Sequence, residues 1–326
     1  MNIFVTGSDG FVGINILKQL LKHDDTIICG SRHDFTPEKL SFLDDKNGQL
    51  RFEKVDVTDT AKLDEVMKKH KVNAVIHAAA VTPTWDIESN YPERVMRVNY
   101  GGTVNVLEAA RKNGVERVVY VSSNGMYGKI NDCDEVIHED HANDPESLYA
   151  LAKYTSEAYC RRMSKITGMR IVSGRVCSTY GPMEAPTASR THMSTVHDLI
   201  FAAINHKEIK VVRPEIKRNW THIYDIAGAL CALLYAEAPS YAEYNLSAGK
   251  NYSLTTVMET IRKYFPDFKF SETTNANEAD IVYNDNSKRG YLDVTRLFND
   301  IQYKPMYPDL DAGIGQYVTW LKEHAA

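Results

Sequence analysis

Apolar runs bounded by turn residues recur along the first half of the chain. Short runs rich in valine and isoleucine predict strands of a sheet that is covered on both faces. The runs are NIFVTG at 2–7, TIICG at 26–30, VNAVIHAAA at 72–80, RVVYVSS at 117–123 and MRIVSGR at 169–175. A further strand is expected just before DVTD at 56–59.

Between these runs, apolar residues recur three and four positions apart, which is the spacing of amphipathic helices. The predicted helices cover residues 13–23, 60–70, 93–114 and 147–168. Strands that alternate with helices favour right-handed crossovers and a parallel sheet. We therefore predict an α/β fold of the Rossmann type, with a doubly wound parallel sheet.

The pattern changes after Tyr180-Gly181-Pro182, where a loop-like stretch precedes a helical and a strand-like segment. Two later stretches, WTHIYDIAGALCALLYA at 220–236 and YNLSAG at 244–249, are apolar enough to return to the main sheet. The predicted main domain covers residues 1–180, with 219–247 returning to it. The predicted smaller C-terminal lobe covers residues 181–218 and 248–326.

Composition narrows the class of function. The 326 residues carry a formal charge of -5, from 38 basic and 43 acidic residues, without a long basic run. A small molecule is therefore expected as the partner, and nucleic acid or an anionic membrane is not. Five scattered cysteines without a CxxC pair argue against disulfides and a metal site. The N-terminus enters a strand at once and no apolar run has membrane-spanning length, so we expect a cytoplasmic protein.

The first strand is joined to the first helix by VTGSDGFVG, which carries Gly7, Gly10 and Gly13. Glycine allows a tight turn and lets backbone N–H groups approach a diphosphate, and a helix N-terminus favours negative charge. The spacing is GxxGxxG, one residue longer than the common dinucleotide fingerprint. Three glycines alone can also make a plain turn, but their place at the first strand-to-helix junction predicts that the main domain binds NAD(P).

The end of the second strand should lie beside the adenosine ribose, where NAD-binding proteins place an acidic residue. This chain reads CGSRHD there, so Arg32 can hold the 2′-phosphate of NADP through a charge-assisted contact. Asp34 is the competing ribose ligand, and Arg32 can also be simply solvated. We predict NADP as the cofactor, with NAD as the alternative. Asp56 is expected to accept a hydrogen bond from the adenine amine, unless this segment supplies a helix cap instead.

Tyr149 and Lys153 lie four positions apart on one face of the predicted helix 147–168. This spacing alone is common. Ser122 and Ser123, however, end the preceding strand, at the sheet edge where open α/β sheets bind ligands. A serine, a tyrosine and a lysine beside a nicotinamide form a proton relay for a hydroxyl that loses hydride. A free tyrosine titrates near ~10, so a nearby ammonium must lower its pKa before it can act as a base near neutrality.

These motifs together resemble the extended short-chain dehydrogenase/reductase family, which contains the NAD(P)-dependent sugar-nucleotide epimerases and dehydratases. The resemblance runs essentially from end to end of the chain. It rests on TGSDGFVG, DVTD, VIHAAA, VNYGGTVNVLEAAR, YVSSNGMYG, YALAK, GRVCSTYGP, RNWTHIYDIAGAL, YNLSAG and LDVTRLFNDIQYKP. It implies a homodimer built on the helices at 93–112 and 149–167.

The resemblance also implies roles for individual residues. Ser123, Tyr149 and Lys153 are expected to be catalytic, with Tyr149 as the general acid/base and Lys153 lowering its pKa. The expected cofactor-binding residues are Gly7, Gly10, Phe11, Val12, Gly13, Arg32, Asp56, Val57, Ala78, Ala79, Ala80, Asn99, Tyr149 and Lys153. The expected substrate-binding residues are Thr82, Ser123, Asn124 and Tyr149 of the main domain and Arg190, Arg218 and Arg289 of the smaller lobe, which is expected to bind substrate. No metal ligand is expected.

Several of these residues also have a structural interpretation. The stretch AAVTPTWD is expected to line the pocket through Thr82, Thr84 and Trp85, although Trp85 can instead pack in the core. His77 is expected to be a buried, hydrogen-bonded residue and not a catalyst. Each arginine of the smaller lobe can instead form a surface or interlobe ion pair.

Two departures from the family pattern bear on the reaction. Dehydratases carry an Asp-Glu pair where this chain has Asn124 and Gly125, so a 4,6-dehydratase is not expected, and the loop before Arg218 is unusual for binding a nucleotide. We predict hydride transfer at a carbohydrate carbinol, in the manner of a sugar-nucleotide epimerase. The alternatives are a net NAD(P)-dependent dehydrogenase or reductase of a smaller sugar, sugar acid or hydroxy compound, and a cofactor-binding regulator without catalysis.

Overall fold

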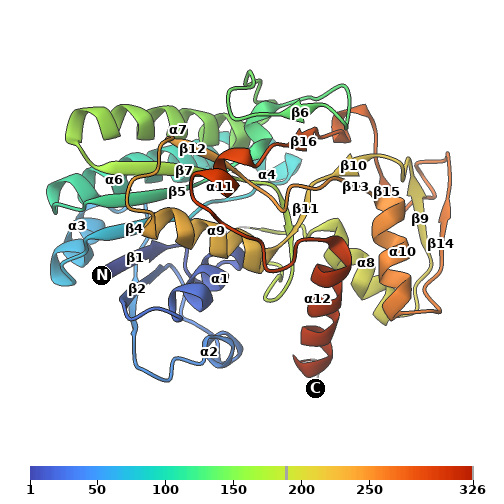
Figure 1. Cartoon of the computed structure of the whole chain (residues 1–326), viewed down its shortest axis with the longest axis horizontal. Helices are drawn as coiled ribbons and strands as arrows, with labels where there is room; N and C mark the ends of the chain where they lie inside the picture. The colour runs from blue at the N-terminus through green and yellow to red at the C-terminus, as the bar shows by residue number, and fades with distance from the viewer. Residues whose placement is uncertain (188–189, 325–326) are drawn as a thin grey trace.

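The computed structural model describes residues 1–187 and 190–324 of the chain. Seven strands form one parallel sheet in the order β12-β7-β5-β4-β1-β2-β3 (Figure 1). They are β1 (Asn2–Thr6), β2 (Thr26–Ser31), β3 (Leu50–Lys54), β4 (Ala74–His77), β5 (Arg117–Ser123), β7 (Arg170–Val176) and β12 (Glu243–Leu246). The order runs outward from β1 in both directions, so the sheet is doubly wound and the predicted fold class is confirmed.

Helices cover both faces of this sheet, which explains why its strands are continuously apolar. Helices α1 (Phe11–Leu20) and α9 (Ile223–Tyr235) pack together on one face (Figure 1). Helices α3 (Thr60–Lys69), α6 (Gly102–Lys112) and α7 (Leu148–Thr167) cover the other. One cluster of buried apolar side chains lies under each group.

Helix α7, which carries Tyr149 and Lys153, begins and ends on clear sequence signals. The hydroxyl of Ser147 accepts a hydrogen bond from the N–H of Ala150 at 3.1 Å and caps the N-terminus. Gly168, with a φ of 75°, ends the helix in the left-handed conformation. The helix packs against β5 and β7, and this contact places its first turns beside the carboxyl end of β5.

The helix predicted at 93–114 is interrupted. It consists of α5 (Pro92–Met96), a π-helical turn η1 (Arg97–Gly101) and α6. Asn99 is buried in the π turn, where its side-chain amide donates to the carbonyl of Val81 at 2.9 Å and accepts from the Val81 N–H at 2.8 Å. The wider turn therefore ties this helix to the loop that follows β4.

A smaller lobe lies beside the sheet (Figure 1). Its elements are α8 (Thr195–Ile204), β9 (Ile209–Val212), β10 (Lys217–Arg218), β13 (Tyr252–Ser253), α10 (Leu254–Tyr264), β14 (Phe270–Glu272), β15 (Ile281–Val282) and α12 (Leu310–His324). A third apolar cluster, which includes Leu199, Val257 and Ile314, holds them together. We propose that the main domain and the lobe divide near the boundaries expected from the sequence, although Tyr180 and Trp220 belong to the lobe cluster and Leu292 and Leu297 to the cluster under α1 and α9.

Short elements complete the chain. They are α2 (Pro37–Leu43), α4 (Trp85–Asn90), η2 (Asn124–Tyr127), β6 (Val136–Ile137), β8 (Ser178–Tyr180), β11 (Trp220–His222), η3 (Asp285–Ser287), β16 (Tyr291–Leu292) and α11 (Thr295–Asn299). Strand β8 pairs with β11, and β6 pairs with β16, both in parallel. No helix among the described residues combines the length and the apolar character that crossing a lipid bilayer requires.

Candidate active site

A cavity of about 580 Å³ opens at the carboxyl ends of the parallel strands. Its lining comes from residues that follow β1, β2, β4, β5 and β7, from α7, and from the segment between β8 and α8. Open α/β sheets bind ligands at this edge. The predicted residues that line the cavity are Gly7, Gly10, Phe11, Val12, Gly13, Arg32, Asp56, Val57, Ala78, Ala79, Ala80, Thr82, Ser123, Tyr149, Lys153, Arg190 and Arg218.

Close backbone approaches shape the glycine loop. Gly7 has a φ of 64°, and a Cβ on it would lie 2.6 Å from the Cα of Ala79. A Cβ on Gly13 would lie 2.1 Å from the carbonyl oxygen of Gly7. Helix α1 begins after Gly10 without a side-chain cap, so the first N–H groups of the helix have no side-chain acceptor. This narrow, uncapped helix N-terminus fits the diphosphate of a dinucleotide.

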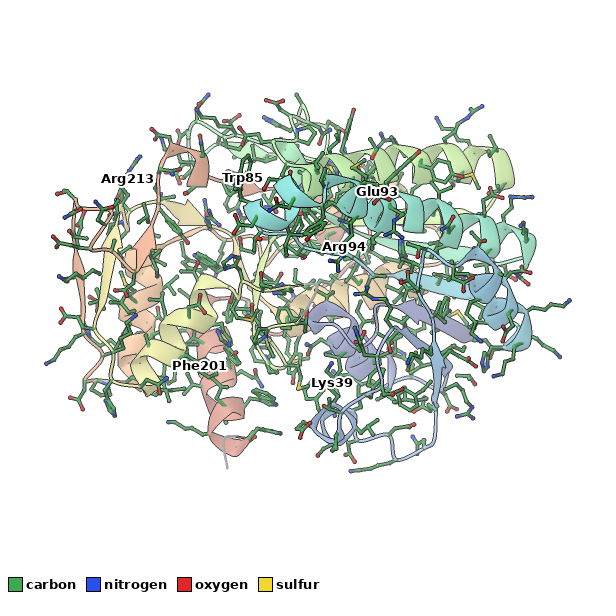
Figure 2. All side chains as sticks on the ribbon, turned by 180° about the vertical axis from the view of Figure 1, so that it is seen from behind. Lys39, Trp85, Glu93, Arg94, Phe201 and Arg213 are labelled. Atoms are coloured by element: carbon green, nitrogen blue, oxygen red, sulfur yellow. The ribbon has the colours of Figure 1, made fainter. Side chains whose placement is uncertain are left out.

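The end of the cavity beside β2 contains both basic and acidic side chains. Arg32 and Asp34, the two competing residues for the adenosine ribose, both line it. Lys39 also lines it, and its Nζ donates to the carbonyl oxygen of Asp9 at 2.7 Å (Figure 2). This end therefore carries groups that suit a 2′-phosphate and groups that suit a ribose diol.

Asp56 lines the cavity with one of its carboxylate oxygens already bonded. Its Oδ1 accepts from the N–H of Thr58 at 2.9 Å and from the Thr58 hydroxyl at 2.8 Å. Burial raises the pKa of Asp56, but these bonds and the charges of Arg32 and Arg97 outweigh burial and hold the pKa below its usual value. The cap of α3 is Asp59. Asp56 is therefore an ionised acceptor at the cavity and not the helix cap.

Ser123, Tyr149 and Lys153 come together at the carboxyl end of β5. The Ser123 hydroxyl lies close enough to the Tyr149 side chain to favour the ionised form of the tyrosine. Lys153 is buried, and its Nζ donates to the carbonyl oxygen of Val121 at 2.7 Å. The same Nζ lies 5.7 Å from the centre of the Tyr149 ring and 4.9 Å from the centre of the Tyr120 ring. The structure thus brings the three candidate catalytic residues to one wall of the cavity.

Burial dominates the ionisation of these residues. It raises the pKa of Tyr149, and the Ser123 hydroxyl and the charge of Arg190 only partly offset this rise. Burial also lowers the pKa of Lys153 to about 8, and its ammonium is directed to the backbone carbonyl of Val121. The lowering of the Tyr149 pKa by Lys153 therefore stays a prediction.

A buried polar network supports the strand that carries Ser123. The hydroxyl of the neighbouring Ser122 donates to Glu157 at 3.0 Å, and Glu157 forms a buried ion pair with Arg175. Arg175 also donates to the hydroxyl of Tyr127 at 2.7 Å. Because the Ser122 hydroxyl is used in this network, Ser123 is the serine that meets Tyr149.

Three predicted site residues do not line the cavity. The side chain of Asn99 is occupied by the backbone of Val81. Asn124 lies in η2, just past the end of β5. Arg289 donates through Nη1 to two carbonyl oxygens of its own loop, at 2.9 and 2.6 Å. Their proposed contacts with cofactor or substrate therefore remain predictions.

The loop after β4 separates the residues that were expected to act together. Thr82 lines the cavity, whereas the Thr84 hydroxyl accepts from the N–H of Ile87 at 3.2 Å and caps α4. Trp85 is 81% exposed on the outside of α4 (Figure 2). Both interpretations of Trp85 are wrong, because α4 directs its first residue to solvent and neither to the cavity nor to the core.

His77 has the structural role expected for it. Its ring nitrogens lie 2.7 Å from the Thr6 hydroxyl and 3.1 Å from the Thr103 hydroxyl. Burial, and after it the charge of Lys153, lowers the pKa of His77 to about 3. The ring is therefore neutral and fully used in packing the centre of the sheet.

Arg218 and Arg289 lie in the lobe as neighbouring cations. The guanidinium of Arg218 stacks 4.8 Å from the centre of the Tyr283 ring, and its Nε donates to the carbonyl of Ser287 at 3.2 Å. Burial, and after it the charge of Arg218, lowers the pKa of Arg289 to about 10. Within the part of the chain that the structure describes, neither forms an ion pair with a carboxylate. Two such cations suit a phosphate-bearing ligand.

Sequence reasoning missed part of the lining. The missed residues include Lys39, Cys177, Ser178, Thr179, Ala185, Thr187, Met193, Ser194, Thr195 and Trp220. Cys177, Ser178 and Thr179 follow the predicted strand 169–175, so the rule that ligands bind at strand carboxyl ends identifies them. Lys39 lies on α2, and most of the others lie between β8 and α8, where no local signal points to the cavity.

The fold and the cavity define a class of protein: a nucleotide-binding α/β enzyme with a serine, a tyrosine and a lysine at the edge of its sheet. A sequence profile described as the NAD dependent epimerase/dehydratase family matches residues 3–247. The chain belongs to this family of extended short-chain dehydrogenase/reductase enzymes, as the motifs predicted.

Named relatives share the whole length of the chain. A putative UDP-glucose 4-epimerase of Methanocaldococcus jannaschii is 27% identical over 99% of both sequences. The UDP-glucose 4-epimerase of Thermotoga maritima, solved with UDP-glucose, covers 100% of both chains with a TM-score of 0.83 at 20% identity. The dTDP-glucose 4,6-dehydratase DesIV of Streptomyces venezuelae, solved with NAD, has a TM-score of 0.81 at 22% identity, covering 99% of this chain and 98% of its own. These structures confirm the fold.

Proposed function

We propose that the protein transfers hydride at a secondary alcohol of a sugar nucleotide, in the manner of an epimerase. The observation that carries this proposal is that Ser123, Tyr149 and Lys153 line the same cavity as the glycine loop, with Nζ of Lys153 5.7 Å from the centre of the Tyr149 ring. A bound NAD(P) would accept a hydride from the carbinol carbon and return it. The residues of the chain would bind the substrate, orient it and move its proton.

Tyr149 is the group that takes and returns the proton of the substrate hydroxyl. Ser123 holds the same substrate oxygen through its hydroxyl, and Lys153 fixes the position of the tyrosine ring and of the cofactor ribose. In the oxidation step the carbinol loses a hydride from carbon and a proton from oxygen, and both return when the ketone is reduced on its other face. Burial raises the pKa of Tyr149, so its phenol must lose its proton before it can take the proton of the carbinol, and the positive nicotinamide of a bound cofactor would favour this loss. Once it holds the carbinol proton, Tyr149 is the acid of the reduction step.

The same site does not support elimination of water. A dehydratase needs an acid and a base next to the serine, where this chain has Asn124 and Gly125. The N–H of Gly125 donates to Oγ of Ser123 at 3.1 Å, and Asn124 does not line the cavity. We therefore assign the protein to the epimerase branch of its family and not to the dehydratase branch.

For the cofactor we propose NADP in preference to NAD, although the family is described as NAD dependent. Arg32 and Lys39 are two basic side chains at the end of the cavity where the adenosine ribose would lie. Asp34 lines the same end and is the residue that would favour NAD. The basic pair also supports the second candidate function, a net NADP-dependent reductase or dehydrogenase. An enzyme of this kind consumes NADPH or NADP stoichiometrically, whereas an epimerase regenerates its cofactor in each cycle.

For the substrate we propose a nucleotide handle held by Arg218 and Arg289. Their neighbouring charges, without carboxylate partners among the described residues, support a diphosphate. Thr82 extends the predicted site from the sheet side of the cavity. Asn124 does not line the cavity, so its predicted contact with the substrate would require movement of η2.

We also propose a homodimer through the helices that contain α6 and α7. Leu151 and Ile166 are exposed on α7, at 36% and 58%, which supports a partner on this face. Sedimentation equilibrium tests the proposal, because a monomer at micromolar concentration contradicts it. Cytoplasmic location stays a prediction of the sequence.

The test of the proposed function is an assay of the purified protein with NAD or NADP and a panel of UDP- and dTDP-sugars. NMR of the sugar follows isomerisation, and absorbance at the nicotinamide band follows cofactor turnover. Isomerisation without a change in absorbance supports the epimerase. A stoichiometric change in absorbance supports the net oxidoreductase instead. Cofactor binding without either signal supports a regulator and contradicts both catalytic proposals.

A further inference from the structure

Arg190 lies on the segment between β8 and α8, which reaches across the cavity to the loop after β4. Its backbone forms an isolated parallel bridge with Thr82 and an antiparallel bridge with Thr187. Its guanidinium lines the cavity and stacks 5.0 Å from the centre of the Phe11 ring. Phe11 is the first residue of α1, so the guanidinium approaches the end of the glycine loop from the opposite side.

The carboxylate of Glu184 anchors this arginine. Glu184 is buried and accepts from Nη2 of Arg190 at 2.5 Å, from the N–H of Ser194 at 2.6 Å and from the Ser194 hydroxyl at 2.8 Å. These bonds hold the two ends of the segment together. The carboxylate therefore has a structural task, and it occupies only one edge of the guanidinium.

The remaining edge of Arg190 contains a donor without a partner. Its Nε is buried and forms no hydrogen bond with any residue that the structure describes. A buried N–H without an acceptor costs free energy, so such groups usually have a specific ligand. In this position the ligand must be an acceptor inside the cavity.

A second contact fixes the segment on the same helix. The side-chain amide of Asn15 on α1 donates to the carbonyl oxygen of Pro182 at 3.0 Å. The segment is therefore attached to α1 through Asn15 as well as through Phe11. These contacts place the charge of Arg190 next to the uncapped N-terminus of α1, whereas the other lobe cations, Arg218 and Arg289, have their contacts at Tyr283 and at loop carbonyls.

We propose that Arg190 binds the diphosphate of the cofactor from the side of the lobe, opposite the glycine loop, and is not a substrate-binding residue. The N–H groups of α1 and the guanidinium would then hold the two sides of the diphosphate, and a phosphate oxygen would accept the bond from Nε. This proposal rests on the proposed function only in requiring a dinucleotide in the cavity. It adds a charged contact that sequence spacing in the glycine loop does not reveal.

The proposal also explains an electrostatic feature of the site. Burial raises the pKa of Tyr149 and the charge of Arg190 partly offsets this rise, so the guanidinium, which stacks on Phe11, is also within electrostatic reach of the catalytic end of the cavity. A bound diphosphate would neutralise this charge. Arg190 would then help to hold the cofactor at the point where its diphosphate joins the nicotinamide half.

The test compares ADP-ribose with AMP, which lacks the second phosphate and its ribose, by isothermal titration calorimetry. The variant is the double substitution Arg190→Met with Glu184→Gln, which leaves no unpaired buried carboxylate. We expect its affinity for ADP-ribose to fall about ten- to a hundredfold, as for loss of a charge-assisted hydrogen bond, with a smaller change for AMP. Arg190→Lys should retain part of the affinity. Arg213→Met, an exposed arginine of the lobe, is the matched control and should bind both ligands as the wild type does (Figure 2).

Other outcomes overturn the proposal. An affinity for ADP-ribose within twofold of wild type shows that Arg190 does not contact the diphosphate. Equal losses for AMP and ADP-ribose, together with a lower thermal midpoint, show a general effect on the fold. A loss of affinity for UDP in a parallel titration, with ADP-ribose binding unchanged, shows that Arg190 is a substrate-binding residue instead. Wild-type protein that binds none of NAD, NADP and ADP-ribose overturns the proposed function as well, whereas the other outcomes leave the proposed function intact.

Discussion

The two walls of the cavity are built in different ways. The cofactor wall, made by Gly7 to Gly13 and Ala78 to Ala80, is formed by backbone atoms at the ends of β1 and β4. The lobe wall, made by Ala185, Thr187, Arg190, Met193 to Thr195 and Arg218, is formed by side chains on short strands and loops. A wall formed by backbone atoms has one shape, which a substitution can only disturb. A wall formed by side chains can bind a different ligand after a single substitution. We therefore propose that, apart from Arg190, the lobe wall sets the choice of substrate, while the cofactor wall and Tyr149 serve the reaction.

Tyr149 lies between the walls, and its removal has the largest expected effect. Tyr149→Phe removes the hydroxyl close to Ser123 and keeps the ring beside Lys153. We expect turnover to fall by about 10² to 10⁴, the usual contribution of a general acid/base, with cofactor affinity almost unchanged. Steady-state kinetics and NADP titration measure the two quantities. Unchanged turnover would show that the chemistry occurs elsewhere.

The cofactor wall is tested at its tightest point. Gly13→Ala forces a Cβ to within 2.1 Å of the Gly7 carbonyl oxygen, so the loop must move. We expect roughly a hundredfold weaker binding of both NAD and NADP, equivalent to about 2.7 kcal/mol. Gly101→Ala is the matched control, because its Cβ would meet no atom closer than 4.0 Å. Equal affinities in the two variants would contradict a backbone-built wall.

The lobe wall is tested at Arg218. Arg218→Gln removes a charge beside Arg289 while the backbone stays in place, so the fold should be preserved. We expect about a tenfold higher KM for the sugar nucleotide, from loss of one charge-assisted contact, and no change in cofactor affinity. Arg213→Gln serves as the exposed control. If cofactor affinity falls instead of substrate affinity, the two walls do not divide their tasks.

Substitution of Arg32 tests whether a side chain on the cofactor wall sets the preference for NADP over NAD. Arg32→Ala should weaken NADP about tenfold and leave NAD nearly unchanged, because only NADP has the extra phosphate. Asp34→Ala is the reciprocal variant and should weaken NAD alone if Asp34 binds the ribose hydroxyls. Fluorescence titration with both cofactors measures these affinities. Identical losses for NADP and NAD in the Arg32 variant would remove the argument for NADP.

The smallest expected effect is the contribution of Lys153 to the pH dependence of the free energy of unfolding. Its pKa is about 8 in the folded protein and near ~10.4 in an unfolded chain. Between these values the unfolded chain binds more protons, so this residue makes stability rise with pH, by at most about 1.4 kcal/mol per pH unit. Lys153→Met should flatten the rise between pH 8 and pH 10. Urea unfolding at several pH values measures the slope, and parallel slopes in the two proteins would contradict the burial of the charge.

The features that the sequence could predict are those that depend on local patterns along the chain. The order of strands and helices, the glycine loop and the meeting of Ser123 with Tyr149 depend on local patterns such as apolar periodicity and a helix capped by Ser147. The place of Trp85 could not be predicted, because a cap at Thr84 starts a new helix that directs the ring outward. The raised pKa of Tyr149 depends on burial, which spacing does not report.

Asn99 shows a second limit. Helical periodicity continues through the π turn, so the pattern predicts one straight helix, while the structure inserts a residue to reach Val81. Arg289 shows a third limit, since the sequence does not reveal that its guanidinium donates to carbonyl oxygens of its own loop; its contact with substrate stays a prediction. In each case a hydrogen bond that spacing does not report decides where the side chain lies.

The bond from Asn15 to Pro182 has a practical consequence for protein engineering. The boundary near residue 181 invites the exchange of whole lobes between related enzymes. A chimera joined there would separate α1 from the native residues that it binds and would remove Glu184 and its hydrogen-bond partners. A chimera that receives a foreign lobe should therefore be joined after Ser194. The donor lobe then brings its substrate specificity, while the recipient keeps its own contacts between α1 and the segment before Ser194.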